Sequence, residues 1–312
     1  MFAIDYFVVD VFTGTALKGN PLAVVMNGCG LTTEQMQAIA REFNLSETTF
    51  VERRPAAVEE SEGVRVRIFT TQEELNFAGH PTLGTASVLM LTAPEVFQGD
   101  TVRLAENVGA IPVRYSGEGL YGEMTQRDPE FGEELNRAEV ARLTGLAESD
   151  LDPGLTPQMV STGTAFAIVP LRDAGMLARL KVNQEEASAW LQERGARWFY
   201  VLGPALEQGG GDEPAWRARM QFYGGEDPAT GSAAGCAIGY LVRHGAVAPG
   251  VRTHVRQGVE MGRESDLYLS AQIQSGSAQR KNGFGEGQNL RVTDVRVGGS
   301  TVLVAKGQLF LP

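Results

Sequence analysis

The chain has 312 residues, a net charge of −11 at pH 7 and a pI near 4.9. This length fits one large domain or two ordinary ones, and the acidic balance argues against a nucleic-acid or anionic-membrane surface, because both need clustered Lys and Arg. Cys29 and Cys236 make no disulfide framework, the first residues lack the basic segment of a signal peptide, and no apolar run reaches membrane-spanning length, so we expect a reducing cytoplasm.

The first half of the chain predicts many short strands and one amphipathic helix. Apolar residues from Met36 to Phe43 fall on one helical face, so we expect a helix that Thr32 or Thr33 caps and that ends near Asn44. In residues 64–68 apolar side chains alternate with arginines, which predicts a strand with one wet face. The strands expected in this half cover residues 2–12, 22–26, 48–52, 64–68, 101–105, 111–115 and 120–124.

The second half repeats the same kinds of segment after a junction predicted at residues 128–136. Helices are expected over residues 137–143 and 185–193, and strands over 157–169, 198–202 and 216–222, with three or four more that end at 301–311. Two glycine-rich segments, 203–214 and 275–289, indicate hairpin tips or mobile covers. Many strands with few central helices favour an α+β fold, and no Gly-x-Gly-x-x-Gly follows a strand, so a dinucleotide site is not expected.

Two similar segments stand 147 residues apart. In one, Asp227 and Pro228 precede a run of small residues; in the other, His80 and Pro81 precede a similar run. Asp is a preferred N-cap and Pro is preferred in the first helical turn, so Asp227 is expected to open a buried helix. The match indicates two halves of similar build, each with a helix whose N-terminus is a ready anion site. The alternative is that His80 and Asp227 are ordinary helix caps.

Glu47 is a third candidate for proton chemistry, because it lies where a helix gives way to a strand. Its neighbours Leu45, Phe50 and Val51 are apolar, and such surroundings raise the pKa of a carboxyl group. Glu47, His80 and Asp227 would make a reasonable proton-transfer set, although the spacing does not show that they meet. The alternative for Glu47 is a capping or exposed residue beside a turn.

The remaining candidate residues favour structural roles. His80, His244 and His254 are the only histidines, and none has metal-ligand spacing, so no metal site is expected. His244 is expected at a helix C-terminus, His254 in a strand and Cys236 in the core. The segment 161–164 fits a polar site loop or a plain turn equally well.

Several blocks, in a fixed order, resemble the phenazine-biosynthesis PhzF-like family. Any one block is weak, but the ordered set is specific. The blocks are Gly19-Asn20-Pro21-Leu22-Ala23-Val24-Val25, Asn44-Leu45-Ser46-Glu47-Thr48-Thr49-Phe50-Val51, Phe77-Ala78-Gly79-His80-Pro81-Thr82-Leu83-Gly84-Thr85-Ala86, Glu226-Asp227-Pro228-Ala229-Thr230-Gly231-Ser232-Ala233 and Gln257-Gly258-Val259-Glu260-Met261-Gly262-Arg263. The segment Ser161-Thr162-Gly163 also resembles a family block.

The resemblance implies a diaminopimelate-epimerase-like fold with two pseudo-symmetric halves, each a curled, mostly antiparallel sheet around a central helix. It implies an isomerase that needs no cofactor, with Glu47 as the proton carrier beside His80 and Asp227. The related epimerases use a pair of cysteines in these loops, and their absence here disfavours two-thiol racemisation. The residues that the resemblance places in contact with a substrate are Ser46, Gly79, Thr230, Gly231 and Ser232.

We therefore expect a cofactor-independent isomerase that moves a proton between carbons of a small carboxylate-bearing molecule in the cytoplasm. The alternatives are an amino-acid epimerase and a small-acid binding protein without turnover. The family resemblance implies a homodimer. We expect one half over residues 1–129 and the other over 130–312, with a last strand that can return to the first half.

Overall fold

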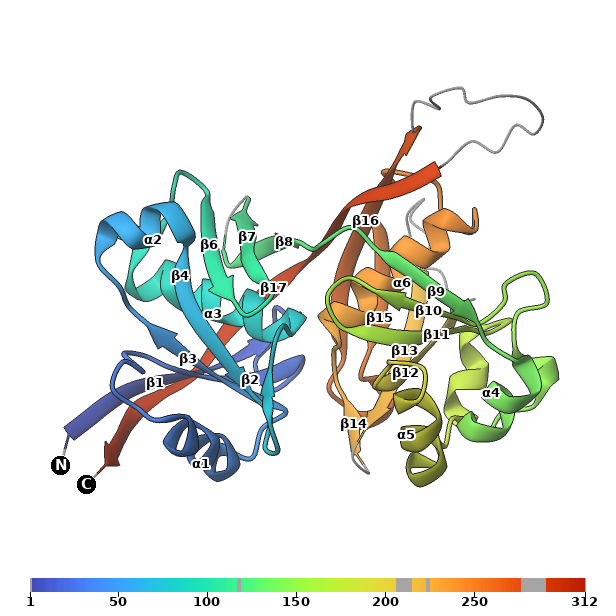
Figure 1. Ribbon diagram of the computed structural model, residues 1–312, viewed down its shortest axis with the longest axis horizontal. Coiled ribbons are helices and arrows are strands. Elements are labelled where there is room, and N and C mark those ends of the chain that lie inside the picture. The colour runs from blue at the N-terminus through green and yellow to red at the C-terminus, as the bar shows by residue number, and fades with distance from the viewer. Residues whose placement is uncertain (1, 117–118, 206–214, 223–224, 276–289, 312) are drawn as a thin grey trace.

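The computed structural model describes residues 2–116, 119–205, 215–222, 225–275 and 290–311. Figure 1 shows two lobes side by side, each a curled sheet around a central helix. The helix is α3 (Gly79–Thr92) in the first lobe and α6 (Gly231–Arg243) in the second. The long strand β17 (Leu290–Leu311) runs through both lobes, where it pairs with β16 in one and with β1 in the other.

Within its described residues, the first lobe holds eight further strands and two outer helices. The helices are α1 (Thr33–Phe43) and α2 (Ala56–Glu62). The strands are β1 (Phe2–Val11), β2 (Asn20–Val25), β3 (Glu47–Glu52), β4 (Val64–Phe69), β5 (Glu74–Leu75), β6 (Thr101–Glu106), β7 (Gly109–Tyr115) and β8 (Tyr121–Thr125).

The second lobe has the same plan. Its outer helices are α4 (Arg137–Thr144) and α5 (Gln184–Gln192). Its strands are β9 (Glu130–Glu134), β10 (Gln158–Ser161), β11 (Ala165–Pro170), β12 (Trp198–Pro204), β13 (Ala215–Phe222), β14 (Gly225–Asp227), β15 (Thr253–Gln257) and β16 (Ser265–Ser275).

The order of strand pairing is identical in the two lobes. From β1 through β2, β3, β4, β6 and β7 to β8 the pairs run antiparallel, parallel, antiparallel, parallel, antiparallel and antiparallel. From β10 through β11, β12, β13, β15 and β16 to β17 the directions repeat in the same order. The short strands β5 and β14 each pair with the strand before them and precede the central helix. The expected pseudo-symmetric halves are present.

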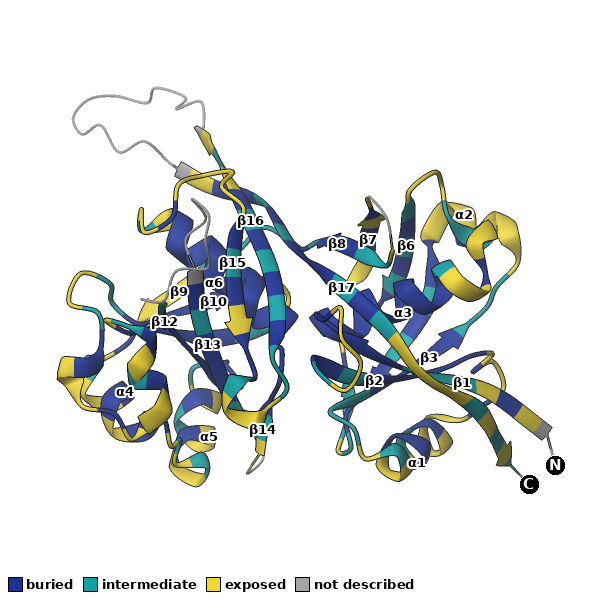
Figure 2. Cartoon of the chain, turned by 180° about the vertical axis from the view of Figure 1, so that it is seen from behind, coloured by how far each residue is buried: buried dark blue, intermediate teal, exposed yellow. Residues whose placement is uncertain are grey.

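The central helices are buried because they are apolar or small-sided around their whole circumference. Figure 2 shows α3 and α6 almost entirely buried, whereas α1, α2, α4 and α5 expose their outer faces. Close packing of α3 requires Gly84, since a Cβ atom there would lie 2.6 Å from the Leu22 side chain. The outer helix α1 begins at the predicted cap Thr32 and ends in a left-handed Asn44.

The structure corrects the sequence-based elements in three places. The junction at residues 128–136 contains β9, which pairs with β10, and the segment 157–169 is two antiparallel strands with a turn at Thr162–Thr164. Helix α2 was not predicted, because its run of Glu and Ala has no apolar stripe. Most of 203–214 and 275–289, the two glycine-rich segments, lies outside the described residues. Among the described helices none is long and apolar enough to cross a membrane.

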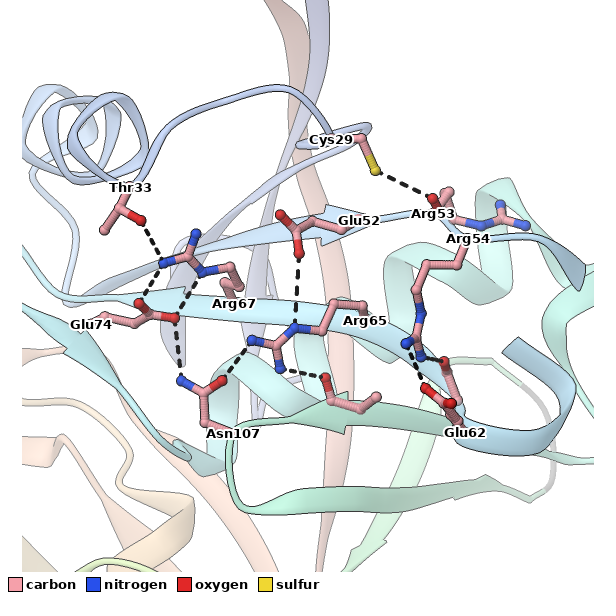
Figure 3. Close-up of polar contacts among 12 residues, drawn as sticks. Cys29, Thr33, Glu52, Arg53, Arg54, Glu62, Arg65, Arg67, Glu74 and Asn107 are labelled. Atoms are coloured by element: carbon pink, nitrogen blue, oxygen red, sulfur yellow. Dashed lines mark hydrogen bonds and ion pairs between the residues drawn. The ribbon is translucent and has the colours of Figure 1, made fainter. Parts of the chain in front are cut away.

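The wet face predicted for residues 64–68 is present on β4. Figure 3 shows Arg65 and Arg67 on this face, paired with acidic and amide side chains of neighbouring segments. Arg67 Nη2 lies 2.6 Å from Glu74 Oε2, and Arg65 Nε lies 3.8 Å from Glu52 Oε2. The opposite face of β4 carries Val64, Val66 and Ile68 into the core around α3.

Candidate active site

The N-termini of the two central helices meet between the lobes. A Cβ atom on Gly79 would lie 2.5 Å from the backbone carbon of Gly231 and from the nitrogen of Ser232. Neither helix has a side-chain cap: Ala78 precedes α3 and Thr230 precedes α6, and neither side chain accepts from its helix in the described structure. Each helix N-terminus carries roughly half a positive charge. Two such ends at one place favour a bound anion.

Glu47 lies beside these helix ends because it is the first residue of β3. Its side chain lines the cavity that the helix ends face, and Oε2 lies 3.5 Å from His80 Nε2. Burial, and then the charge of Asp227, raise the pKa of Glu47 well above its usual 4.5. The raised pKa is in the direction that the apolar neighbours of Glu47 predict, and it suits a group that takes and returns protons near neutral pH.

His80 lies in the first turn of α3 and is 3% exposed. Burial lowers the pKa of its imidazole from 6.5 to about 3, so the ring is neutral at physiological pH. Its Nδ1 lies 3.1 Å from Nδ2 of Asn20, and its Nε2 faces Glu47. His80 is therefore an uncharged hydrogen-bonding group beside the carboxyl group of Glu47.

Asp227 is not the N-cap that the sequence predicts. It is the last residue of β14, and α6 begins four residues later. Its carboxylate accepts hydrogen bonds from Thr230 Oγ1 at 2.6 Å and from Asn20 Nδ2 at 2.7 Å, while Gln257 Nε2 donates to its backbone oxygen at 2.8 Å. Burial raises the pKa of Asp227, and the bonds from Thr230 and Asn20 oppose that rise.

The segment after Asp227 explains why it is not a cap. Pro228 and Ala229 form a short turn, and the side-chain hydroxyl of Thr230 is directed back at Asp227. Gln257 accepts from the Thr230 backbone nitrogen at 3.1 Å and so holds this turn in place. The proline therefore shapes the approach to α6 and does not lie inside it.

The two halves are also related by a different offset from the one that the motifs indicate. Gly79 and Gly231 begin the two helices and are 152 residues apart, so the position equivalent to His80 is Ser232 and not Asp227. Leu75 stands four residues before α3, as Asp227 does before α6. The match at 147 residues followed Pro and Gly, but Pro81 and Gly84 lie inside α3, whereas Pro228 precedes α6 and Gly231 begins it.

Glu47 has an aromatic counterpart in the second half. It begins β3 opposite Leu22 of β2, and Trp198 begins β12 opposite Phe166 of β11. These two strand pairs hold the same place in the shared topology. Both Glu47 and Trp198 line the cavity. The site is therefore asymmetric, with a carboxyl group from the first lobe where the second lobe provides an indole ring.

The predicted substrate contacts divide between two neighbouring hollows. Gly79, Thr230, Gly231 and Ser232 line the cavity with the three proton-transfer candidates. Ser46 lines an adjoining open groove, and its hydroxyl group lowers the pKa of Asp227. The rest of the cavity wall is largely apolar, and its members are Leu75, Phe77, Ala78, Phe166, Trp198, Met220 and Phe222, with Thr70 and Thr164 between them.

The residues expected to be structural are so. Cys236 is fully buried, His244 ends α6 and contacts Gln158, and His254 lies in β15 with Nε2 2.7 Å from Asp266 Oδ1. The segment 161–164 is a turn between strands that also places Thr164 in the cavity wall. No group of three or more His, Cys, Asp or Glu side chains within the described ranges could hold a metal ion.

Among the residues of the site that were not predicted, three have a clear part in its geometry. Asn20 and Gln257 hold Asp227, and Trp198 faces the cavity. Asn20 and Gln257 each stand inside a block that carries the family resemblance, which is the signal that could have found them. Trp198 becomes visible only through the topological equivalence of β3 and β12.

Comparisons with known proteins agree with this architecture. The family model described as phenazine biosynthesis-like protein matches residues 9–307. An uncharacterized isomerase of Mesorhizobium japonicum is 34% identical, in an alignment that covers 98% of this chain and 99% of that protein. The trans-2,3-dihydro-3-hydroxyanthranilate isomerase of Pseudomonas aeruginosa is 33% identical, with 98% and 99% covered. The crystal structure of a PhzF-family phenazine biosynthesis protein of Bacillus anthracis superposes with a TM-score of 0.80 over 100% of both chains at 24% identity. The predicted fold class is confirmed.

Proposed function

Because the chain belongs to the phenazine biosynthesis-like family and is an isomerase, we propose that it moves a proton between two carbons of a small carboxylate-bearing substrate, with Glu47 as the proton carrier. The observation that carries the proposal is the position of Glu47. Its largely buried carboxyl group lies in the cavity where two uncapped helix N-termini meet.

The helix ends supply the site for the substrate's carboxylate. Backbone N–H groups at Gly79 and Ser232 lie at helix starts, where an anion is favoured without any cationic side chain. The apolar wall around Trp198 then receives the rest of the molecule. A ring-bearing acid fits this division, so the substrate named for the Pseudomonas aeruginosa relative is the first candidate.

The proposed reaction needs one acid–base group. The Glu47 carboxylate takes a proton from one carbon, the electron pair left behind moves into the conjugated system, and the proton returns to another carbon of the same molecule. No group is oxidised or reduced. Negative charge that develops on the substrate is stabilised by the helix N-termini, and a general base of matched pKa typically contributes 10²–10⁴-fold.

The asymmetry of the site favours this reaction over epimerisation. A two-base epimerase needs an acid–base group on each face of one carbon. The place equivalent to Glu47 in the second lobe holds Trp198, and the Asp227 carboxylate of that lobe is engaged by hydrogen bonds from Asn20 and Thr230. The thiols offer no substitute, since Cys236 is buried in α6 and Cys29 is exposed on the first lobe, and neither lines the cavity.

Isotope exchange separates the three candidate functions. The enzyme is incubated in D2O with trans-2,3-dihydro-3-hydroxyanthranilate and other small ring acids, and products are read by mass spectrometry and NMR. We expect the product to carry deuterium at the carbon that receives the proton, which is a different carbon from the one that loses it, and to have a shifted double bond. Deuterium at one inverted stereocentre would indicate an epimerase, and saturable binding without exchange would indicate a binding protein.

A further inference from the structure

Asn20 connects the reacting groups of both lobes through one side-chain nitrogen. It opens β2 and is completely buried. Its Nδ2 lies 3.1 Å from His80 Nδ1 in the first lobe, and 2.7 Å from Asp227 Oδ1 and 2.8 Å from the backbone oxygen of Ala229 in the second. The amide therefore reaches three acceptor positions with two hydrogens.

The backbone oxygen of Ala229 fixes which end of the amide is the nitrogen. A carbonyl oxygen carries no hydrogen, so an amide oxygen at this place would face another oxygen at 2.8 Å with no hydrogen between them. The amide nitrogen satisfies that oxygen and the Asp227 carboxylate together. Only this orientation agrees with both neighbours.

The orientation of the amide determines the protonation of the His80 ring. An amide nitrogen donates hydrogen bonds and accepts none, so Nδ1 at 3.1 Å must present its lone pair. When an amide hydrogen points at Nδ1, a hydrogen on Nδ1 would clash with it; when both amide hydrogens go to the oxygens, a hydrogen on Nδ1 would face a nitrogen that has no lone pair to accept it. We propose that Asn20 is a positioning residue that holds His80 as the neutral tautomer with its hydrogen on Nε2.

This tautomer gives the two oxygens of Glu47 different tasks. His80 Nε2 and Glu47 Oε2 lie 3.5 Å apart, and both atoms are buried without a hydrogen-bond partner within the described residues. In this tautomer the Nε2 hydrogen lies on the side of Glu47 Oε2, which can offer it a lone pair. The proton exchanged with the substrate is then carried by Oε1. The tautomer follows from the geometry alone, whereas its use in proton transfer rests on the proposed function.

The tautomer is measurable without a substrate. The chain contains three histidines, so long-range ¹H–¹⁵N correlation spectra of protein labelled with ¹⁵N-histidine are simple, and a His80→Gln variant identifies the His80 signals. We expect wild-type His80 as a single neutral form with hydrogen on Nε2 from pH 5 to pH 9. Signals of His244 and His254, which lie in other contacts, serve as internal references.

Two substitutions test the role of Asn20 itself. Asn20→Asp replaces the donor by an acceptor, so the His80 hydrogen is expected to move to Nδ1. Asn20→Ala removes the donor and should give a mixture of tautomers. Asn107→Asp, on the outer surface of the first lobe shown in Figure 3, is the matched control and should leave His80 unchanged.

The inference is overturned if wild-type His80 carries its hydrogen on Nδ1 or is a mixture, a result that does not depend on either variant folding. It is also overturned if both Asn20 variants fold, as judged by the His244 and His254 signals, and retain the Nε2–H form. A different result, full isotope exchange by Glu47→Gln, would remove the proposed function and leave the tautomer standing.

Discussion

Gly79 and Gly231 touch, and through this contact the N-termini of the two central helices meet. The backbone carbon of Gly231 lies 2.5 Å from where a Cβ atom of Gly79 would be. A separation this small allows hydrogen on Gly79 and nothing larger. Both helices direct unpaired N–H groups at one place because neither carries a side chain at this contact.

Gly79→Ala should therefore separate the helix ends and damage the site. The added methyl group meets backbone atoms, which cannot rotate away, so we expect a loss of about 1–3 kcal/mol in the free energy of unfolding and a large loss of isomerase activity. Gly14→Ala is the matched control, because a Cβ atom there meets nothing within 4 Å. Denaturant unfolding and turnover of both variants check this, and equal behaviour of the two would contradict it.

The pH dependence of activity should follow the ionisation of Glu47, and Asp227 should shift the pKa of that ionisation. Glu47 acts as a base when ionised, and burial with the Asp227 charge raises its pKa, so kcat/KM should fall as the pH drops through a value well above 4.5. Asp227→Asn removes the neighbouring charge and should move this acidic limb to lower pH. Ionisation of His80 should cause no change in kcat/KM near neutral pH, because its pKa is about 3. An acidic limb that stays in place in Asp227→Asn would count against the electrostatic coupling.

A buried acid outside the cavity should affect stability and not turnover. Burial raises the pKa of Glu106 to about 8, and its Oε1 lies 2.6 Å from Thr82 Oγ1 in α3. The Thr82 hydroxyl donates its hydrogen to the Ala78 backbone oxygen, so its oxygen can accept a hydrogen bond from a protonated Glu106. The folded pKa lies above the unfolded value of 4.5, so this stability is present below pH 4.5 and is lost as the pH rises towards 8.

Glu106→Gln keeps a donor and cannot ionise. Its melting temperature relative to wild type should therefore rise by several degrees between pH 5 and pH 8. Glu139→Gln, at an exposed position of α4, should follow wild type across this range. Thermal unfolding at half-unit pH steps checks the prediction, and parallel curves for wild type and Glu106→Gln would refute it.

Local patterns in the sequence are sufficient to predict most elements of this fold. The stripe from Met36 to Phe43 with its Thr32 cap gave α1, and alternation gave β4, because both signals depend on neighbours along the chain. Strand β9 is not visible in the sequence, because its residues are largely exposed and its partner β10 comes much later in the chain.

The site shows the same limit. Glu47, His80 and Asp227 were selected by local context, and the structure brings all three to one cavity. The predicted equivalence of His80 and Asp227 is wrong, because a Pro and a Gly near a helix start do not determine at which residue the helix begins. The role of Asn20 depends on which side chains meet between the lobes, and that of Trp198 depends on which strands pair within the second lobe. One sequence reveals neither.

The most direct test of the account compares Glu47→Gln with Glu52→Gln in D2O exchange. Both residues are in β3, but Glu47 faces the cavity while Glu52 points to the outer face beside Arg65, as Figure 3 shows. We predict that Glu47→Gln lowers the exchange rate by about 10²–10⁴-fold with substrate affinity kept, and that Glu52→Gln exchanges like wild type. Exchange by Glu47→Gln at the wild-type rate would show that another group carries the proton.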